Sequence, residues 1–320
     1  MPDLFVNVLL LAVGVVVLYQ GAEWLVQGSA RLAASLHISP IVVGLTVVSF
    51  GTSAPELVVS VVAALGGNPD LAIGNVMGSN LANIGLILGL TSIVRPLQVH
   101  RRVVTRETPL MLLVTAALYP LIRDLDLGRV DGVILLLVLA GYLLFVMRSV
   151  EDEAPEILGE YEEFMKASSE PGTGVRGLDI LWVLLGSACL VVGGYCIVHG
   201  AVRVATALGV SQIVIGLTVV AIGTSLPELA TSVVAAVRKE ADIAVGNIIG
   251  SNIFNIAAIL GVTSVLEPLR IDPSILTREL PAVLIVSLLL LPILRSGWRI
   301  RRWEGALLLA AYIGAGVYIL

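Results

Sequence analysis

Charge is scarce in this 320-residue sequence, in which only 13% of the residues are Asp, Glu, Lys or Arg. A water-soluble domain carries about a quarter charged residues, so this chain has too few charges to cover a water-facing surface. The apolar set instead makes up 57% of the chain, and the mean hydropathy is +0.99. The shortage of charge therefore excludes a soluble domain and indicates an integral membrane protein.

Aromatic residues are also few, at 5% of the chain. No basic patch is interleaved with them, which argues against a nucleic-acid-binding protein. The net charge of −5 is concentrated in residues 151–170, where eight carboxylates accompany a single lysine, Lys166. The net charge therefore describes one segment and says little about binding partners.

Cysteine and histidine are nearly absent. Cys189 and Cys196 lie seven residues apart in one predicted helix, roughly 10 Å from each other, which is too far for a disulfide. His37, His100 and His199 have no metal-ligand spacing. Because no Ser-His or His-Glu-x-x-His arrangement lies among the predicted spans, we predict neither an enzyme nor a cofactor.

Long apolar runs, by contrast, recur along the chain, and a membrane-spanning helix needs roughly 20 such residues. The N-terminus lacks a basic region and a small-residue cleavage site before its apolar run, so we do not interpret it as a signal peptide.

An internal repeat relates the two halves at a constant offset of 172 residues. Residues 44–63, GLTVVSFGTSAPELVVSVVA, return at 216–235 as GLTVVAIGTSLPELATSVVA. Residues 72–89, AIGNVMGSNLANIGLILG, return at 244–261 as AVGNIIGSNIFNIAAILG. The chain is therefore two copies of one unit.

Each copy is predicted to contain five spans, which gives an all-α integral membrane protein with ten transmembrane helices as two inverted five-helix repeats. The predicted domains are the first repeat (1–147), an acidic cytoplasmic linker (148–177) and the second, inverted repeat (178–320). The predicted spans are 4–35, 41–65, 71–93, 105–122, 130–147, 178–208, 213–237, 242–264, 275–294 and 303–320.

An odd number of spans per copy places the second copy upside down, and the charges test this arrangement. With the N-terminus outside, 14 of the 19 Lys and Arg residues fall in cytoplasmic segments, as the positive-inside rule expects. The five outside are Arg123, Arg129, Arg203, Arg270 and Arg278. We therefore predict a multi-pass protein of the cell (plasma) membrane with both termini outside.

Each repeat carries one glutamate in the middle of a span, at the end of the segments GTSAPE (51–56) and GTSLPE (223–228). A proline inside a helix removes an N–H donor and clashes with the carbonyl four residues earlier. Glycine at that earlier position allows unusual backbone angles, so we expect a helix break in both segments. The residues of the two breaks are Gly51, Pro55, Gly223 and Pro227.

The two breaks supply oxygen ligands of three kinds. Freed carbonyls, neighbouring hydroxyls and a carboxylate form the ligand set that hard cations prefer. Because charges in a bilayer are costly unless they face each other or a ligand, we expect Glu56 and Glu228 to meet near the midplane. Two carboxylates in an empty apolar site repel, and bound cations keep both ionised. The hydroxyls are those of Thr52, Ser53, Thr224 and Ser225.

The third and eighth spans each carry a polar stripe with a spacing of four residues. The stripes consist of Asn75, Ser79 and Asn83 in the first repeat and Asn247, Ser251 and Asn255 in the second. A single kinked helix, or a single Asn on a helix, is often only structural. Their symmetric occurrence in two repeats favours a transport site between the halves.

Glu23 also lies in an apolar run, but its counterpart is Tyr195, and we interpret Glu23 as a structural or entrance residue.

At these residues the sequence resembles the calcium/cation antiporter superfamily, specifically its prokaryotic sodium/calcium exchanger branch. The two alpha-repeats of that family combine GTSxPE with a G-N-x-x-G-S-N block. Both stand here twice, at 51–56 with 74–80 and at 223–228 with 246–252. The resemblance covers nearly the whole chain and implies ten transmembrane helices, a central diamond of ion sites, and exchange of Na+ for Ca2+ without ATP.

The resemblance also implies ligands. Calcium would be bound by Glu56, Glu228, Thr52 and Thr224. Sodium would be bound by Ser53, Glu56, Ser79, Asn83, Ser225, Glu228, Ser251 and Asn255.

One departure leaves the coupling open. Close relatives can carry an aspartate where this chain has Asn255, so here the two glutamates alone set the charge of the site. A Ca2+/H+ or K+-dependent cation/Ca2+ exchanger with the same glutamates is the alternative, although GTSxPE, rather than the GNxxE-like signature of proton-coupled relatives, favours Na+. A cation channel, which passes ions without a counter-ion, is a further alternative. The expected partners are Na+, Ca2+ and the lipid bilayer, and no protein partner is implied.

Overall fold

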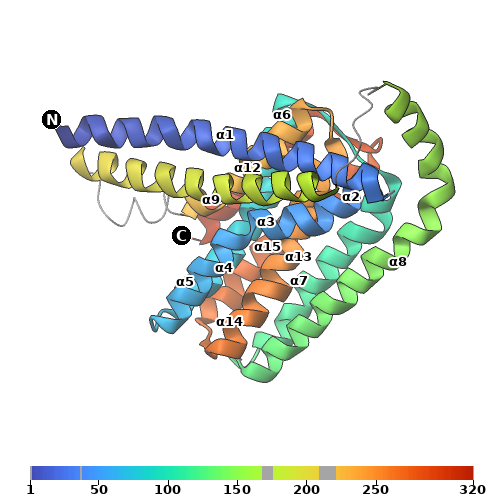
Figure 1. The fold of residues 1–320 in the computed structure, drawn as a ribbon. Helices are drawn as coiled ribbons and strands as arrows, with labels where there is room; N and C mark the ends of the chain where they lie inside the picture. The colour runs from blue at the N-terminus through green and yellow to red at the C-terminus, as the bar shows by residue number, and fades with distance from the viewer. Residues whose placement is uncertain (1, 37, 168–175, 209–220, 320) are drawn as a thin grey trace.

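The structure is a computed structural model that describes residues 2–36, 38–167, 176–208 and 221–319 (Figure 1). Side chains are described for residues 6–36, 38–148, 177–208 and 222–319. Helices dominate, and short π-helical segments, labelled η, interrupt several of them.

The elements of the first half are α1 (Pro2–Leu36), α2 (Pro40–Val43), η1 (Gly44–Val48), α3 (Ser49–Thr52), α4 (Ala54–Leu65), α5 (Pro69–Leu81), η2 (Ala82–Ile87), α6 (Leu88–Val94), β1 (Leu97–Gln98), η3 (Val103–Glu107), α7 (Thr108–Ile122), β2 (Asp126–Leu127) and α8 (Arg129–Ala167). Those of the second half are α9 (Arg176–Ala207), α11 (Ala221–Thr224), α12 (Leu226–Val237), α13 (Ala241–Phe254), η5 (Asn255–Leu260), α14 (Gly261–Leu266), β3 (Leu269–Arg270), η6 (Ile275–Glu279), α15 (Leu280–Arg295), β4 (Arg299–Ile300) and α16 (Arg302–Ile319).

The all-α membrane fold expected from the sequence is confirmed. Among the described residues, six helices are long and apolar enough to cross a membrane, and the bent run Pro40–Thr52 with Ala54–Leu65 makes a seventh if it is one span. The start of the predicted span 213–237 lies outside the described residues. The count of ten spans and the division into domains stay predictions.

The fifth span agrees with its predicted bounds, because the apolar part of α8 long enough to cross a membrane is Arg129–Arg148. The helix itself continues beyond this span to Ala167, into the segment predicted as the acidic linker. Residues 151–167 include six Glu, two Ala, one Leu, one Met and one Lys, all of which are strong helix formers. Most of the predicted linker is therefore a continuation of the helix, and residues 168–175 lie outside the described part of the chain.

Two long helices, α1 and α9, form a layer of their own (Figure 1). They pack antiparallel along their whole length through glycines that recur every seven residues, so that Gly21 of α1 lies against the backbone of Gly186 on α9. A Cβ added to Gly186 would lie 2.5 Å from the backbone nitrogen of Leu25. The glycines of this interface are Gly14, Gly21, Gly28, Gly186, Gly193 and Gly200.

The two polar-striped helices lie at the centre of the molecule. In the run α5–η2–α6, 78% of the most apolar window is buried, and in α13–η5–α14 the share is 94%. The corresponding shares for α1 and α9 are only 33% and 28%. The central helices therefore bury both their apolar and their polar residues in protein, whereas α1 and α9 present most of their surface outward.

Two short antiparallel strand pairs, which lie in the connections between helices, join the two halves of the chain. Strand β1 pairs with β4, and β2 pairs with β3, so each pairing takes one strand from each repeat. The pairings continue beyond the strands, because Val99 N–H donates to the carbonyl of Trp298 at 2.8 Å and Ile271 N–H donates to the carbonyl of Leu125 at 2.9 Å.

We expect Gly186→Ala to destabilise the protein by about 1–3 kcal/mol, because the new methyl group meets backbone atoms that cannot move aside. Gly141→Ala, on the exposed face of α8 with nothing within 4 Å of its Cβ position, is the control. Thermal unfolding of the purified protein in detergent measures both. Equal unfolding temperatures for the two variants would contradict the tight packing of α1 on α9.

Candidate functional site

The predicted helix breaks are present in both repeats. Helix α3 ends at Thr52 and α4 begins at Ala54, with a bend of 44° across the break. In the second repeat, α11 ends at Thr224 and α12 begins at Leu226. The residues between them, Ser53 and Ser225, leave the helical angles with φ −82° and −87° and ψ near zero.

The prolines and glycines of the two motifs have different roles. Pro55 and Pro227 lie in the first turn of the new helices, where a proline lacks only an N–H that has no helical partner. Gly51 and Gly223 lie inside the short helices α3 and α11, not in an unwound segment as expected. A Cβ on Gly51 would lie 2.6 Å from Ser187 Oγ on α9, so the glycines allow close helix packing instead.

The two glutamates are buried and are bridged by serines of the opposite repeat. Glu56 and Glu228 are each 1% exposed. The Ser53 hydroxyl donates to Glu228 Oε1 at 3.1 Å, and the Ser225 hydroxyl donates to Glu56 Oε1 at 3.4 Å. Each carboxylate lies in the first turn of a helix, where the helix dipole favours negative charge. Neither repeat forms this arrangement alone.

Neighbouring hydroxyls extend the network. The Thr52 hydroxyl donates to Asn247 Oδ1 at 3.1 Å, and Ser79 Oγ lies 3.4 Å from Ser225 Oγ. Thr224 is half-buried at the inner end of α11. Ser251 is fully buried, and its hydroxyl has no hydrogen-bond partner among the described residues.

The asparagines Asn83 and Asn255 lie at the start of π-helical segments. Asn255 begins η5, and Asn83 is the second residue of η2. Single π-helical turns inside α-helices often occur at functional sites. Both side-chain amide atoms of Asn83 are buried without a hydrogen-bond partner among the described residues, whereas Asn255 Nδ2 donates to Asn80 Oδ1 at 2.9 Å.

The other two asparagines of the stripes hold the broken helices in place. Asn75 Nδ2 donates to the carbonyl of Glu56 at 3.2 Å and to Ser60 Oγ at 3.0 Å. Asn247 Nδ2 donates to Ser232 Oγ at 3.3 Å. Their amides therefore fix α4 against α5 and α12 against α13, close to the glutamates.

Several buried polar residues of this region were not predicted as ligands, among them Ser60, Asn80, Ser232 and Asn252. Asn80 Nδ2 donates to the carbonyl of Asn252 at 3.2 Å, which joins the two repeats at the centre. A signal was available, because the 172-residue offset relates Ser60 to Ser232 and Asn80 to Asn252. The repeat alignment thus marks these positions as paired polar residues inside apolar spans.

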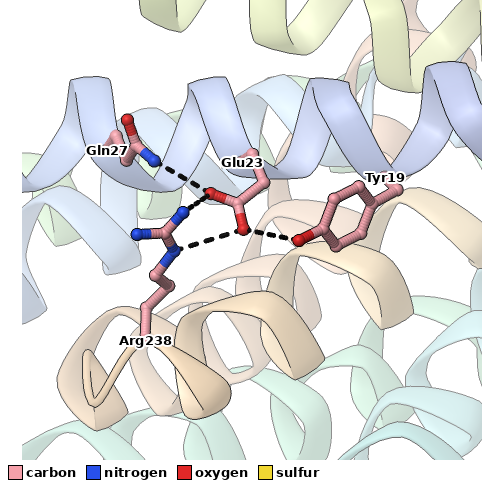
Figure 2. Close-up of polar contacts among 4 residues, drawn as sticks. All are labelled: Tyr19, Glu23, Gln27 and Arg238. Atoms are coloured by element: carbon pink, nitrogen blue, oxygen red, sulfur yellow. Dashed lines mark hydrogen bonds and ion pairs between the residues drawn. The ribbon is translucent and has the colours of Figure 1, made fainter.

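Glu23 lies outside this network. It accepts hydrogen bonds from Tyr19, Gln27 and Arg238 (Figure 2), and its role as a structural or entrance residue stays a prediction.

Taken together, buried helices broken at matching points and carboxylates shared between the halves define a membrane transporter of the inverted-repeat type. The sequence profile of the family described as "Sodium/calcium exchanger protein" matches residues 6–148 and again 178–320. The chain therefore belongs to the sodium/calcium exchanger family.

Three known proteins are similar to this chain over most of their length. The sodium/calcium exchanger MaX1 of Methanosarcina acetivorans is 32% identical over 96% of this chain and 97% of its own. The inner membrane protein YrbG of Escherichia coli is 39% identical over 88% and 86%. A structure of the sodium-calcium exchanger NCX_Mj, soaked with zero Na+ and Ca2+, superposes with a TM-score of 0.84 at 33% identity, over 99% of this chain and 100% of that one.

We expect Asn80→Ala to lower the free energy of unfolding by about 1–3 kcal/mol, because the buried amide of Asn255 loses its acceptor. Asn68→Ala is the matched control, since the Asn68 side chain is exposed and bonds only the nearby carbonyl of Gly66. Denaturation of both variants in detergent measures the difference. A loss for Asn68→Ala as large as that for Asn80→Ala would contradict the role assigned to Asn80.

Proposed function

We propose that the chain is a secondary active antiporter that exchanges Na+ for Ca2+ by alternating access at the site between the two helix breaks. The observation that carries the proposal is the reciprocal bridging of Glu56 and Glu228 by serines of the opposite repeat. Membership of the sodium/calcium exchanger family supports it independently.

The oxygens left without partners support cations as the missing ligands. Buried polar atoms in proteins are almost always hydrogen-bonded. Here several buried oxygens close to the breaks lack a partner among the described residues, and a hard cation would satisfy them together. They are Glu56 Oε2, Glu228 Oε2, Asn83 Oδ1, Ser251 Oγ and Asn255 Oδ1.

The charge of the two glutamates accounts for exchange. When both are ionised, one Ca2+ or at least two Na+ neutralise them. An empty site would carry two like charges into a low-dielectric interior, which is costly. The conformational change therefore proceeds with a loaded site, and the departure of one ion species requires the arrival of the other.

We assign the ligands as the family resemblance suggests. The calcium ligands are Glu56, Glu228, Thr52 and Thr224. The sodium ligands are Ser53, Glu56, Ser79, Asn83, Ser225, Glu228, Ser251 and Asn255. The supporting geometry is that these residues lie on the two broken helices and the two striped helices that pack against them.

We also propose a location in the plasma membrane with both termini outside. Three connections that the charge rule places in the cytoplasm line one cavity of about 660 Å3 in the structure, namely residues 98–101, 239–242, 297–299 and 301. This cavity includes Arg101, Lys239, Arg299 and Arg301. Their common location agrees with one basic, cytoplasmic face.

We expect Glu56→Gln and Glu228→Gln each to lower Na+-gradient-driven Ca2+ uptake by about 100-fold or more, because a desolvated cation loses a charged ligand. Uptake of radioactive Ca2+ into proteoliposomes measures the effect. Glu267→Gln, at an exposed position after α14, is the control and should transport normally. Near-normal uptake by both site variants would exclude the mechanism.

The coupling ion is tested by separate gradients. We expect Ca2+ uptake by the unmodified protein to require an outward Na+ gradient, with a pH gradient or K+ alone giving only background. Proteoliposomes in which Na+, K+ and pH are varied one at a time measure this. Uptake driven by pH without Na+ would identify proton exchange, and Ca2+ flux without any counter-ion would identify a channel.

A further inference from the structure

Glu23 accepts four hydrogen bonds, two of which come from Arg238 and link α1 to the end of α12 (Figure 2). Tyr19 and Gln27, one turn away on either side, donate to its two oxygens at 3.0 and 2.9 Å. Arg238 donates Nε to Glu23 Oε1 at 3.2 Å and Nη2 to Oε2. The carboxylate is buried and the guanidinium is half exposed. This bidentate ion pair therefore joins the layer formed by α1 and α9 to the broken helix α12.

Helices α1 and α9 are packed more tightly against each other than against the central helices. Its two helices approach backbone to backbone at their glycines, and Arg31 of α1 pairs with Asp179 of α9 at 3.1 Å. Their low buried shares show that much of their surface faces away from the core. The α1–α9 pair is therefore a unit that can shift as a whole against the broken helices.

The position of this unit is not symmetric. Helix α1 packs along α12, but α9, its equivalent in the other repeat, has no comparable interface with α4. Exact two-fold symmetry would make these interfaces alike. In a protein of inverted repeats, the alternate state exchanges the arrangements of the two halves, so in that state α9 packs along α4 and α1 leaves α12.

The residues of the ion pair are not symmetric either. At the 172-residue offset, Glu23 corresponds to Tyr195 and Arg238 corresponds to Gly66. The alternate state therefore has no acidic and basic residues at the matching positions. Tyr195 instead stacks on His199, with ring centroids 3.9 Å apart.

We propose that the Glu23–Arg238 pair is a one-sided latch, which stabilises the state described here over its inverted counterpart and so sets the resting balance of the transporter. This inference rests on the alternating access proposed above. Leaving this state requires the latch to open and a buried carboxylate to find new partners. Loss of the latch shifts the balance toward the other state, and apparent Ca2+ affinity then changes in opposite directions at the two membrane faces.

Distances between α4 and α9 test the latch directly. Spin labels at Val62 on α4 and Val192 on α9, both at exposed positions, report whether α9 approaches α4, in a background with Cys189 and Cys196 replaced by Ala. We expect Glu23→Gln to increase the population of short separations. Arg238→Gln removes the same pair from the other side and should act alike, so one variant that fails to fold leaves the test intact.

Arg31→Gln is the matched control, because it breaks an ion pair inside the α1–α9 unit and should leave the distances unchanged. The substitutions Gly66→Arg and Tyr195→Glu place an equivalent ion pair at the repeat-related positions, and we expect this pair to stabilise the alternate state. In proteoliposomes, Glu23→Gln should change half-saturating Ca2+ by about fivefold or more, upward at one face and downward at the other.

Two results would overturn the latch: a distance distribution unchanged in both Glu23→Gln and Arg238→Gln, or an equal shift in Arg31→Gln. The distance measurement needs no transport, so it separates this inference from the proposed function. A clear shift in a protein that does not exchange Na+ for Ca2+ would support the latch and contradict the function.

Discussion

A carboxylate inside a membrane is stable only where other groups replace the water that it has lost. Glu23 meets this constraint fully, through an arginine and two neutral donors. Glu56 and Glu228 meet it only in part, because each has one oxygen with a serine donor and one without a partner among the described residues. Glu23 thus forms a complete polar contact, whereas the two central glutamates each keep one carboxylate oxygen for which the described residues supply no donor.

The surrounding helices place polar groups around Glu56 and Glu228. The breaks bring two helix N-termini and two hydroxyl-bearing turns into the interior, where intact helices would offer neither. The buried asparagines then hold the broken helices at fixed positions. Glycine contacts let neighbouring helices approach closely, as at Gly250, where an added Cβ would lie 2.6 Å from the carbonyl oxygen of Leu45. Water is thus replaced by polar groups that neighbouring helices hold at fixed positions.

Much of this arrangement can be predicted from the repeat. Constant offset and proline position together locate both breaks and both glutamates. The function of Gly51 cannot be predicted locally, because it depends on the approach of Ser187 from another helix. The partner of Glu23 is likewise hidden, since Arg238 is 215 residues away and its repeat counterpart is a glycine. Helix α8 continues beyond the predicted span because apolar length sets the width of a span but does not end a helix.

The crossed strand pairings have a consequence for how the protein is made. Strand β1 is synthesised about 200 residues before its partner β4. At the usual rate of translation this interval takes roughly 10–40 s. Until the connection between α15 and α16, which carries β4, has been synthesised, β1 of the first half lacks its partner strand. The early half therefore cannot mature alone, and its biogenesis ends only when the final helix has been inserted.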